Sequence, residues 1–261
     1  MTHEEDTLTN AQLESIQNEI KQSQKLTSHL LPLQDLSSQF DPSSNFATGC
    51  KYLSTKYKHY RAIRRDGNCY YRAFLFALCE KLLYHSNGFL THILDFVRNS
   101  MKEVTKYGYD KFAVEAFQEE LIDLLEFLST RPPIEHLEMR LNEENASSDY
   151  SCWYLRCITS SYIKADADRF IHFIDDPQYV TVESFCAREV DPMGRESGEI
   201  QVLALAEAFG VCVNIEYLDG RDLQNGHLVK HSFGPQKDDD DDDVLDICLL
   251  YRPGHYDILY E

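Results

Sequence analysis

The sequence predicts an α+β fold in which helices pack around a small sheet. Three observations indicate this class. Apolar residues recur at helical spacing through most of the region from 69 to 174. Short alternating or β-branched runs gather after residue 210. The chain has 261 residues, of which 43% are apolar, enough for one domain with a buried core and an extension.

The first 30 residues are predicted to form a partly flexible arm. They are polar, but Leu13, Ile16 and Ile20 share one helical face, and Asn10 suits the cap of that helix. So thin an apolar stripe gives a helix that is marginal in water by itself. The segment is therefore a docked arm, a partner-binding helix, or mostly disordered.

The main domain is expected over residues 31–261. Its first half opens with a loop-like stretch, 31–50, and is then mostly helical. Leu121, Leu124, Leu125 and Leu128 show the helical spacing most clearly, and the following prolines end that helix. The expected elements are a short helix at 50–57, an extended segment at 60–64, and helices at 69–83, 89–107, 110–129 and 134–141.

The second half changes from helices to strands near residue 180. Val180 and Thr181 are expected to be extended, and Gly210 closes the last long helix. The expected helices are 149–163, 165–174, a short one at 182–188, and 200–209. The expected strands are 211–218, a short edge strand at 231–233, a buried strand at 244–251, and 255–260 after a tight turn.

The charge balance excludes several classes of protein. A formal net charge of −19 would repel the phosphates of nucleic acid. Charges break every apolar run well before the length of a membrane span, and the N-terminus lacks the pattern of a secretory signal. We therefore expect a soluble protein of the cytoplasm, and a nuclear location as well stays open. The acidic run Asp238 to Asp243 is best interpreted as a solvated loop; a metal site is less favoured, and steering of a basic partner stays open.

The eight cysteines are interpreted as reduced thiols. They form no Cys-x-x-Cys pair, which argues against a zinc finger or ribbon. A large apolar chain without a secretory signal points to a reducing compartment, where most thiols are small core residues.

One cysteine has the surroundings of a nucleophile. Cys69 follows the turn-forming residues Asp66, Gly67 and Asn68 and starts an apolar helical pattern. At a helix N-terminus the dipole and free N–H groups stabilise a thiolate. The same N–H groups, with those of residues 66–68, can receive an oxyanion. The alternative is a core cysteine at a helix start, and Asp66 is either a support of this loop or only the first residue of a turn.

The last expected strand supplies a base and a carboxylate. Residues i and i+2 of a strand lie on the same side, so His255 and Asp257 are neighbours. Asp257 can accept a hydrogen bond from one imidazole nitrogen and leave the other for the thiol. Tyr256 and Ile258 then face the core, and Gly254 leaves room beside the histidine. A surface His-x-Asp pair is the alternative interpretation.

These segments resemble one protease family. Residues 66–74, DGNCYYRAF, resemble the nucleophile motif of the ovarian-tumour (OTU) cysteine proteases, with Tyr70 where the family has phenylalanine. Residues 251–260, YRPGHYDILY, resemble the closing motif of its otubain branch. Segments 148–156 and 185–206 are similar to otubains as well, so the resemblance runs from about residue 31 to the end.

The resemblance implies a papain-like fold, with a small mixed or antiparallel sheet packed by a helical lobe, and deubiquitinating activity. By carry-over Cys69 is the nucleophile, His255 the general base and acid, and Asp257 its orienting group, while Asp66 belongs to the oxyanion-loop motif with the backbone of Gly67 and Asn68. Otubains tend to prefer the polyubiquitin linkage that targets proteins to the proteasome. Their N-terminal helix can contact the proximal ubiquitin. The chemistry needs neither metal nor cofactor.

Two other functions stay open. The first is a binder of ubiquitin or of ubiquitin-conjugating enzymes that inhibits without turnover, as some family members do. The second keeps the thiol chemistry but acts on another ubiquitin-like modifier. A purely structural role is the weakest alternative, because it treats both motifs as coincidence.

Overall fold

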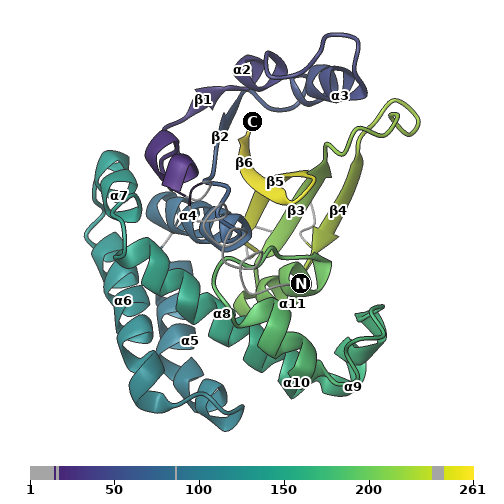
Figure 1. Cartoon of the computed structure of the whole chain (residues 1–261). Coiled ribbons are helices and arrows are strands. Elements are labelled where there is room, and N and C mark those ends of the chain that lie inside the picture. The colour runs from purple at the N-terminus through teal and green to yellow at the C-terminus, as the bar shows by residue number, and fades with distance from the viewer. Residues whose placement is uncertain (1–14, 16–17, 86, 237–243) are drawn as a thin grey trace.

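The computed structural model describes residues 15, 18–85, 87–236 and 244–261. A six-stranded mixed sheet lies beside a lobe of helices (Figure 1), which confirms the predicted fold class. The strands are β1 (Leu31–Pro32), β2 (His59–Arg61), β3 (Cys212–Tyr217), β4 (Val229–Phe233), β5 (Asp246–Arg252) and β6 (His255–Tyr260). Their order is β1-β2-β6-β5-β3-β4, with β3 and β5 parallel and the other neighbours antiparallel.

The helices fall close to the predicted ranges. The long ones are α4 (Cys69–Tyr84), α5 (Asn87–Lys106), α6 (Lys111–Ser129), α8 (Ser147–Ala165) and α11 (Glu199–Phe209). The short ones are α2 (Leu33–Ser37), α3 (Asn45–Leu53), α7 (Ile134–Leu141), α9 (Ala167–Phe170), a 3-10 turn (Ile171–Phe173) and α10 (Val182–Phe185), which continues into a π-helix (Cys186–Val190). Gly210 closes α11 in the left-handed conformation, with φ of 64°, as its position predicts.

Some local predictions were wrong. The helix expected at 50–57 is α3, which begins earlier because the Ser44 side chain accepts a hydrogen bond from the Ala47 N–H and caps it. The stretch expected as a loop contains β1 and α2, whose Leu33 and Leu36 are fully buried. Both elements depend on contacts with β2 and α3, which no local pattern reveals.

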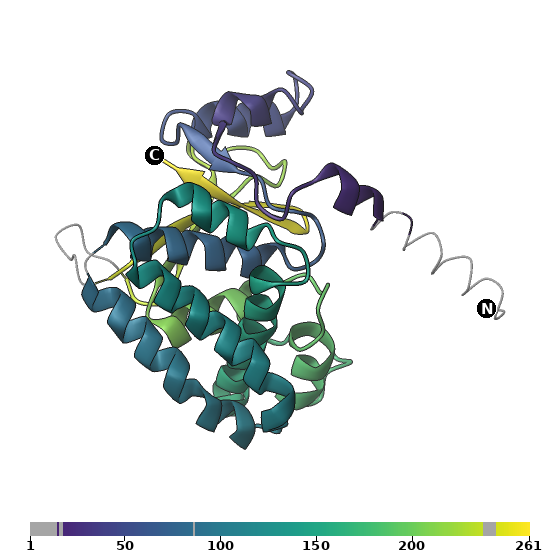
Figure 2. The same cartoon turned by 90° about the vertical axis from the view of Figure 1, so that its left-hand side faces the viewer.

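Helix α4 occupies the centre of the molecule. Almost all of its side chains are buried, as expected for a helix covered on every side. It packs against β5 and β6 on one side and against helices of the lobe on the other, as Figures 1 and 2 show. The opposite face of the sheet is covered by α2 and α3. Alternate residues of β6 join the two cores: Tyr256 and Ile258 face α4, as predicted, and Leu259 faces α3.

The end of the predicted arm is attached to the domain. Residues 18–23 are helical, Leu26 is buried, and Thr27 forms a bridge with Ile63. The division into an arm, 1–30, and a domain, 31–261, stays a prediction. Asn10, Leu13 and Ile16, like the acidic run Asp238 to Asp243, lie outside the described residues.

Among the described residues, no helix has the length and apolar character needed to cross a bilayer.

Candidate active site

Cys69 is the first residue of α4 and is 2% exposed. Burial raises the pKa of its thiol to about 12, and the nearby carboxylates of Asp66 and Asp257 act in the same direction. Hydrogen bonds from the backbone N–H groups of Tyr256 and Tyr70 lower the pKa and only partly oppose burial. The contact with Tyr256 places the sulfur against β6, and the thiol is neutral in this resting arrangement.

His255 and Asp257 lie side by side on β6. The imidazole Nε2 is 2.9 Å from Asp257 Oδ1, on one face of the strand as the strand period predicts. Both side chains are buried, with exposed fractions of 2% and 0%. The other ring nitrogen, Nδ1, is buried and has no hydrogen-bond partner among the described residues. A buried nitrogen without a partner is unusual and is available for a proton transfer.

Asp257 is held by three groups from three segments. Its Oδ1 also accepts a hydrogen bond from the Ile63 N–H at 3.0 Å, and its Oδ2 pairs with the Arg252 guanidinium. Burial favours the neutral acid, but the hydrogen bond and charge of His255, then Arg252, then the Ile63 N–H outweigh it and lower the pKa of Asp257. The carboxylate is therefore ionised and fixed in direction, as an orienting group must be.

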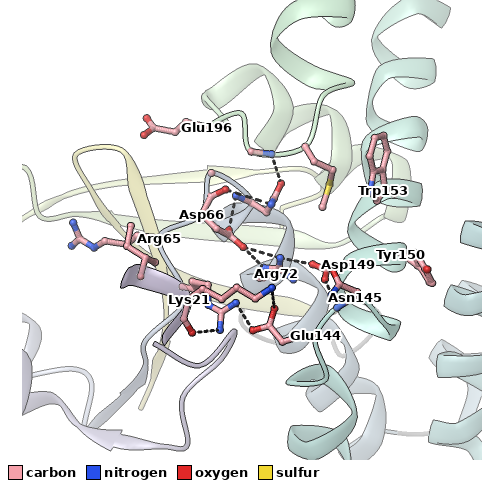
Figure 3. Close-up of a pocket in the computed structure, with 16 residues that line it drawn as sticks. Lys21, Arg65, Asp66, Arg72, Glu144, Asn145, Asp149, Tyr150, Trp153 and Glu196 are labelled. Atoms are coloured by element: carbon pink, nitrogen blue, oxygen red, sulfur yellow. Dashed lines mark hydrogen bonds and ion pairs between the residues drawn. The ribbon is translucent and has the colours of Figure 1, made fainter. Parts of the chain in front are cut away.

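Asp66 ties the turn before Cys69 to α4 and α8. Its Oδ1 accepts a hydrogen bond from the Asn68 N–H at 2.9 Å, which closes the turn locally. Its Oδ2 accepts from Arg72 Nε and Nη2 at 3.0 and 2.8 Å. Arg72 also contacts Asp149 Oδ1 at 2.6 Å, so that its guanidinium lies between the carboxylates of Asp66 and Asp149, as Figure 3 shows. Asp66 is thus both the first residue of a turn and a support of the loop.

The turn itself presses against a second loop. Gly67 has φ of +73°, and a Cβ there would lie 2.1 Å from the Gly194 carbonyl oxygen, so only glycine fits. Asn68 Oδ1 accepts a hydrogen bond from the Gly194 N–H at 2.9 Å. Within the described chain the backbone N–H groups of Gly67 and Cys69 have no backbone acceptor. Those two donors are the ones free to receive an oxyanion, because Asp66 already occupies the Asn68 N–H.

Two clefts flank the site. The first, of about 640 Å³, lies beside the 66–68 turn and reaches Ile20 and Lys21 of the N-terminal helical segment. Figure 3 shows Trp153 on α8 and Glu196 on the facing loop at its borders. The second cleft, of about 470 Å³, lies beside Tyr256. Its lining is formed by residues of α11, the sheet and their loops: Ser197, Gly198, Glu199, Tyr217, Asp219, Arg221, Val229, His231, Tyr251, Pro253 and Tyr256.

Sequence reasoning missed three buried arginines. Arg252 pairs with Asp257, Arg72 binds Asp66, and Arg156 reaches the 66–68 turn from α8. All three are at most 8% exposed, although arginine is seldom buried without a task. The available signal was a charged residue inside an otherwise apolar helix or strand. The predicted nucleophile, base, orienting acid and turn residues all lie in one region of the structure.

A model of the family described as Peptidase C65 otubain matches residues 18–261. This chain belongs to the otubain family. Ubiquitin thioesterase OTUB1 of Homo sapiens is 35% identical over 254 residues, which cover 96% of this otubain and 89% of the human protein. Ubiquitin thioesterase otubain-like of Caenorhabditis elegans is 31% identical and covers 100% of this chain and 90% of the worm protein.

Solved structures agree over nearly the whole otubain. "The structure of h/ceOTUB1-ubiquitin aldehyde-UBC13~Ub" matches with a TM-score of 0.87 and 31% identity, covering 98% of each chain. "The structure of h/ceOTUB1-ubiquitin aldehyde-UBCH5B~Ub" matches with a TM-score of 0.87 and 30% identity, covering 99% of each. These findings confirm the predicted family and the cysteine-peptidase fold.

Proposed function

We propose that this otubain is a deubiquitinase that hydrolyses the isopeptide bond at the C-terminus of ubiquitin. The observation that carries the proposal is the placement of the Cys69 thiol at the start of α4, against the strand that holds His255 and Asp257. The human and worm ubiquitin thioesterases, which are similar to this chain over about nine-tenths of their length, support ubiquitin as the substrate.

The reaction begins with proton transfer from Cys69 to His255. The thiolate attacks the carbonyl carbon of the C-terminal glycine of ubiquitin, and the oxyanion is received by the N–H groups of Gly67 and Cys69. His255 returns the proton to the departing lysine amine, and a thioester forms. Water, deprotonated by His255, then hydrolyses the thioester and frees the ubiquitin carboxylate.

The raised thiol pKa constrains the first step. With a pKa of about 12, Cys69 is not a resting thiolate, so His255 must accept its proton as part of the attack. The unpartnered Nδ1 suits this role because Asp257 already holds Nε2. Asp257 stabilises the imidazolium that results.

The two clefts suit the two sides of the substrate. We assign the ubiquitin tail to the cleft beside Tyr256, and the lysine side to the cleft beside the 66–68 turn. The second assignment is supported by Ile20 and Lys21, which line that cleft. They belong to the N-terminal segment, which by its resemblance to otubains can contact the proximal ubiquitin. We also propose a preference for the proteasome-targeting polyubiquitin linkage, which the resemblance to otubains implies.

The test is cleavage of di-ubiquitins of every linkage. Wild-type protein should cleave, with one linkage fastest, and Cys69→Ser should be inactive. Cys79→Ser is the matched control, because Cys79 is also a buried cysteine of α4 but lies away from the turn. Full hydrolysis by Cys69→Ser would contradict the proposed nucleophile. Equal rates on all linkages would contradict the proposed preference.

A second function is inhibition of ubiquitin-conjugating enzymes. The two similar solved structures carry UBC13~Ub and UBCH5B~Ub in their titles, which supports such partners for this chain. A Cys69→Ala protein that still blocks chain synthesis by a conjugating enzyme would establish this role separately from hydrolysis.

A further inference from the structure

Arg156 is a charged side chain in the middle of the protein. It lies on α8, is 0% exposed, and stacks its guanidinium on the Tyr71 ring at 4.4 Å. Its hydrogen-bond acceptors among the described residues are neutral carbonyl and amide oxygens, and its Nε has no acceptor there. A buried, unneutralised charge opposes folding, and an apolar residue of similar size is often better tolerated. The arginine therefore needs an explanation other than stability.

The acceptors of Arg156 all belong to two segments: the 66–68 turn, and residues 190–195, which begin at the end of the π-helix and are called the 190–195 loop. Its Nη2 donates to the Gly67 carbonyl at 3.1 Å, to Asn68 Oδ1 at 2.9 Å and to the Arg195 carbonyl at 2.7 Å. Its Nη1 donates to the Val190 carbonyl at 2.9 Å. One guanidinium thus joins the 66–68 turn to the 190–195 loop.

By holding the Gly67 carbonyl, Arg156 orients the whole peptide unit between Gly67 and Asn68. The peptide unit is planar, so the direction of the Gly67 C=O determines the direction of the Asn68 N–H on the other side of the bond. Arg156 holds the oxygen end, and Asp66 Oδ1 holds the N–H end at 2.9 Å. The turn cannot flip this peptide without breaking both contacts. The two adjoining peptide units carry the Gly67 and Cys69 N–H groups, and anchoring the unit between them restricts how far they can turn.

We infer that Arg156 is a positioning residue of catalysis, which keeps the oxyanion donors of the turn in place before substrate binds. Its uncompensated positive charge also favours negative charge developing on that turn. The inference rests on the proposed hydrolysis at Cys69. Arg156 does not touch the substrate and acts only through the turn.

The test compares Arg156→Lys and Arg156→Met with wild type on a ubiquitin–coumarin amide. Lysine keeps the charge but cannot reach acceptors in both loops, so we expect kcat to fall about 10-fold, and about 100-fold for methionine, with KM changed less than about threefold. Ubiquitin aldehyde forms an adduct whose oxygen lies at the same oxyanion donors. Its affinity should weaken by a similar factor.

A second reaction separates positioning from general damage. Alkylation of Cys69 by iodoacetamide is a direct displacement that forms no oxyanion, so its rate should match wild type in Arg156→Lys. Arg140→Lys is the control, because Arg140 bridges Glu120, Asp123 and Ser147 away from the turn. It should keep wild-type kcat.

A double variant tests whether Arg156 affects kcat through its contact with Asn68. Asn68→Ala removes one acceptor that Arg156 shares with the Gly194 N–H. If both residues act through this contact, Arg156→Lys with Asn68→Ala should be no slower than the slower single variant. Fully multiplicative losses would contradict a shared route.

The outcomes distinguish the inference from the function on which it rests. Wild-type kcat in a folded Arg156→Lys, or equal losses in kcat and alkylation, would overturn the positioning role alone. If wild type and Arg140→Lys neither cleave the amide nor bind ubiquitin aldehyde, the proposed function fails and the inference fails with it.

Discussion

At the scale of single residues, both carboxylate oxygens of Asp257 are held in place. This residue is fully buried and receives hydrogen bonds from His255, Ile63 and Arg252. Arg252 is its diagonal neighbour across the β5–β6 pair, in which Arg252 lies opposite His255. Orientation of the histidine and attachment of the 63–69 segment to the sheet therefore depend on the same carboxylate.

The first prediction concerns Asp257→Asn. The amide cannot stabilise an imidazolium, so kcat on a ubiquitin–coumarin amide should fall by about 10²- to 10⁴-fold, less than the loss for Cys69→Ala. Steady-state kinetics with active-site titration checks this. Asp95→Asn, on an exposed side chain of α5, is the control and should retain wild-type kcat. An Asp257→Asn protein as active as wild type would exclude the assigned role.

The second prediction concerns how the contribution of the Asp257 carboxylate to the free energy of unfolding changes with pH. The folded pKa of Asp257 is lowered, so its ionised form stabilises the fold above the unfolded pKa of about 3.9, and this contribution disappears as pH falls through the lower folded pKa. The gap in free energy of unfolding between wild type and Asp257→Asn should stay constant from about pH 7 to 5 and narrow below about pH 4. Urea unfolding across this range measures it. If the difference in free energy of unfolding grew in acid instead, the pKa of Asp257 would be raised in the folded protein and not lowered.

The third prediction concerns the thiol. Because the pKa of Cys69 is raised to about 12, its thiolate fraction should grow with pH throughout the neutral range. Alkylation of Cys69 by iodoacetamide, followed by peptide mass spectrometry, should speed up about tenfold per pH unit from pH 6 to 9. The unfolded protein should level off instead, above its ordinary pKa of about 8.5. A plateau near neutral pH in the folded protein would indicate a resting Cys–His ion pair.

Part of the site was predictable because its groups are close in sequence. Strand period places His255 beside Asp257, and turn composition places Cys69 at a helix start. The partners Arg72, Arg156 and Arg252 were not predicted. For the first two, an arginine within an apolar helix shows that something must satisfy it but not which loop does so.

At the scale of elements, Arg64 is one of the side chains that join the N-terminal segment to the site. Arg64 Nε and Nη2 donate to the Gln24 carbonyl at 2.9 and 2.5 Å, and Nη2 reaches the Lys21 carbonyl at 3.3 Å. The guanidinium also pairs with Glu144 at 2.5 Å, on the far side of the same cleft. The position of the helical segment at the cleft therefore depends partly on Arg64, together with the Lys21–Glu144 ion pair.

The fourth prediction is that Arg64→Ala slows cleavage of di-ubiquitin but not cleavage of a ubiquitin–coumarin amide. Loss of the arm contacts should lower kcat/KM for the preferred di-ubiquitin by about fivefold, a change of about 1 kcal/mol. The ubiquitin–coumarin amide has no proximal ubiquitin, so its kcat/KM should stay unchanged. Arg98→Ala, which removes exposed ion pairs on α5, is the control. Equal losses on both substrates would place the effect of Arg64 in the catalytic turn instead.

Elements with a strong apolar periodicity were predicted well. Elements that form because of tertiary contacts were not. Helices α5, α6 and α7 and strand β6 follow from spacing and from the turns that bound them. β1 is two residues long and exists because it pairs with β2. The π-helix Cys186–Val190 likewise has no distinguishing sequence pattern.

At the scale of the whole molecule, sheet order is what the sequence does not reveal. Alternation indicates that strands exist, but not that β6 lies between β2 and β5. The arrangement is decided by long-range packing on α4, whose buried surface covers the sheet from one side.

The fifth prediction tests the redox state of the whole chain. All eight cysteines are free in the structure, and seven are buried. Thiol titration in guanidinium without reductant should therefore give eight thiols per chain, whereas the native protein should react slowly. A lower count in freshly purified protein would show that disulfides exist.

The central place of β6 has a consequence for folding. The Ile63 N–H and the Asp257 carboxylate that join β6 to the nucleophile segment are 194 residues apart, so their contact closes a very long loop. Such contacts carry a large entropic cost and tend to form late. A chain with a folded helical lobe but an unpaired β6 would have Cys69 without His255, the base that we propose for it. Partly folded molecules should therefore be proteolytically inert, and activity should recover during refolding only with the slowest, global phase.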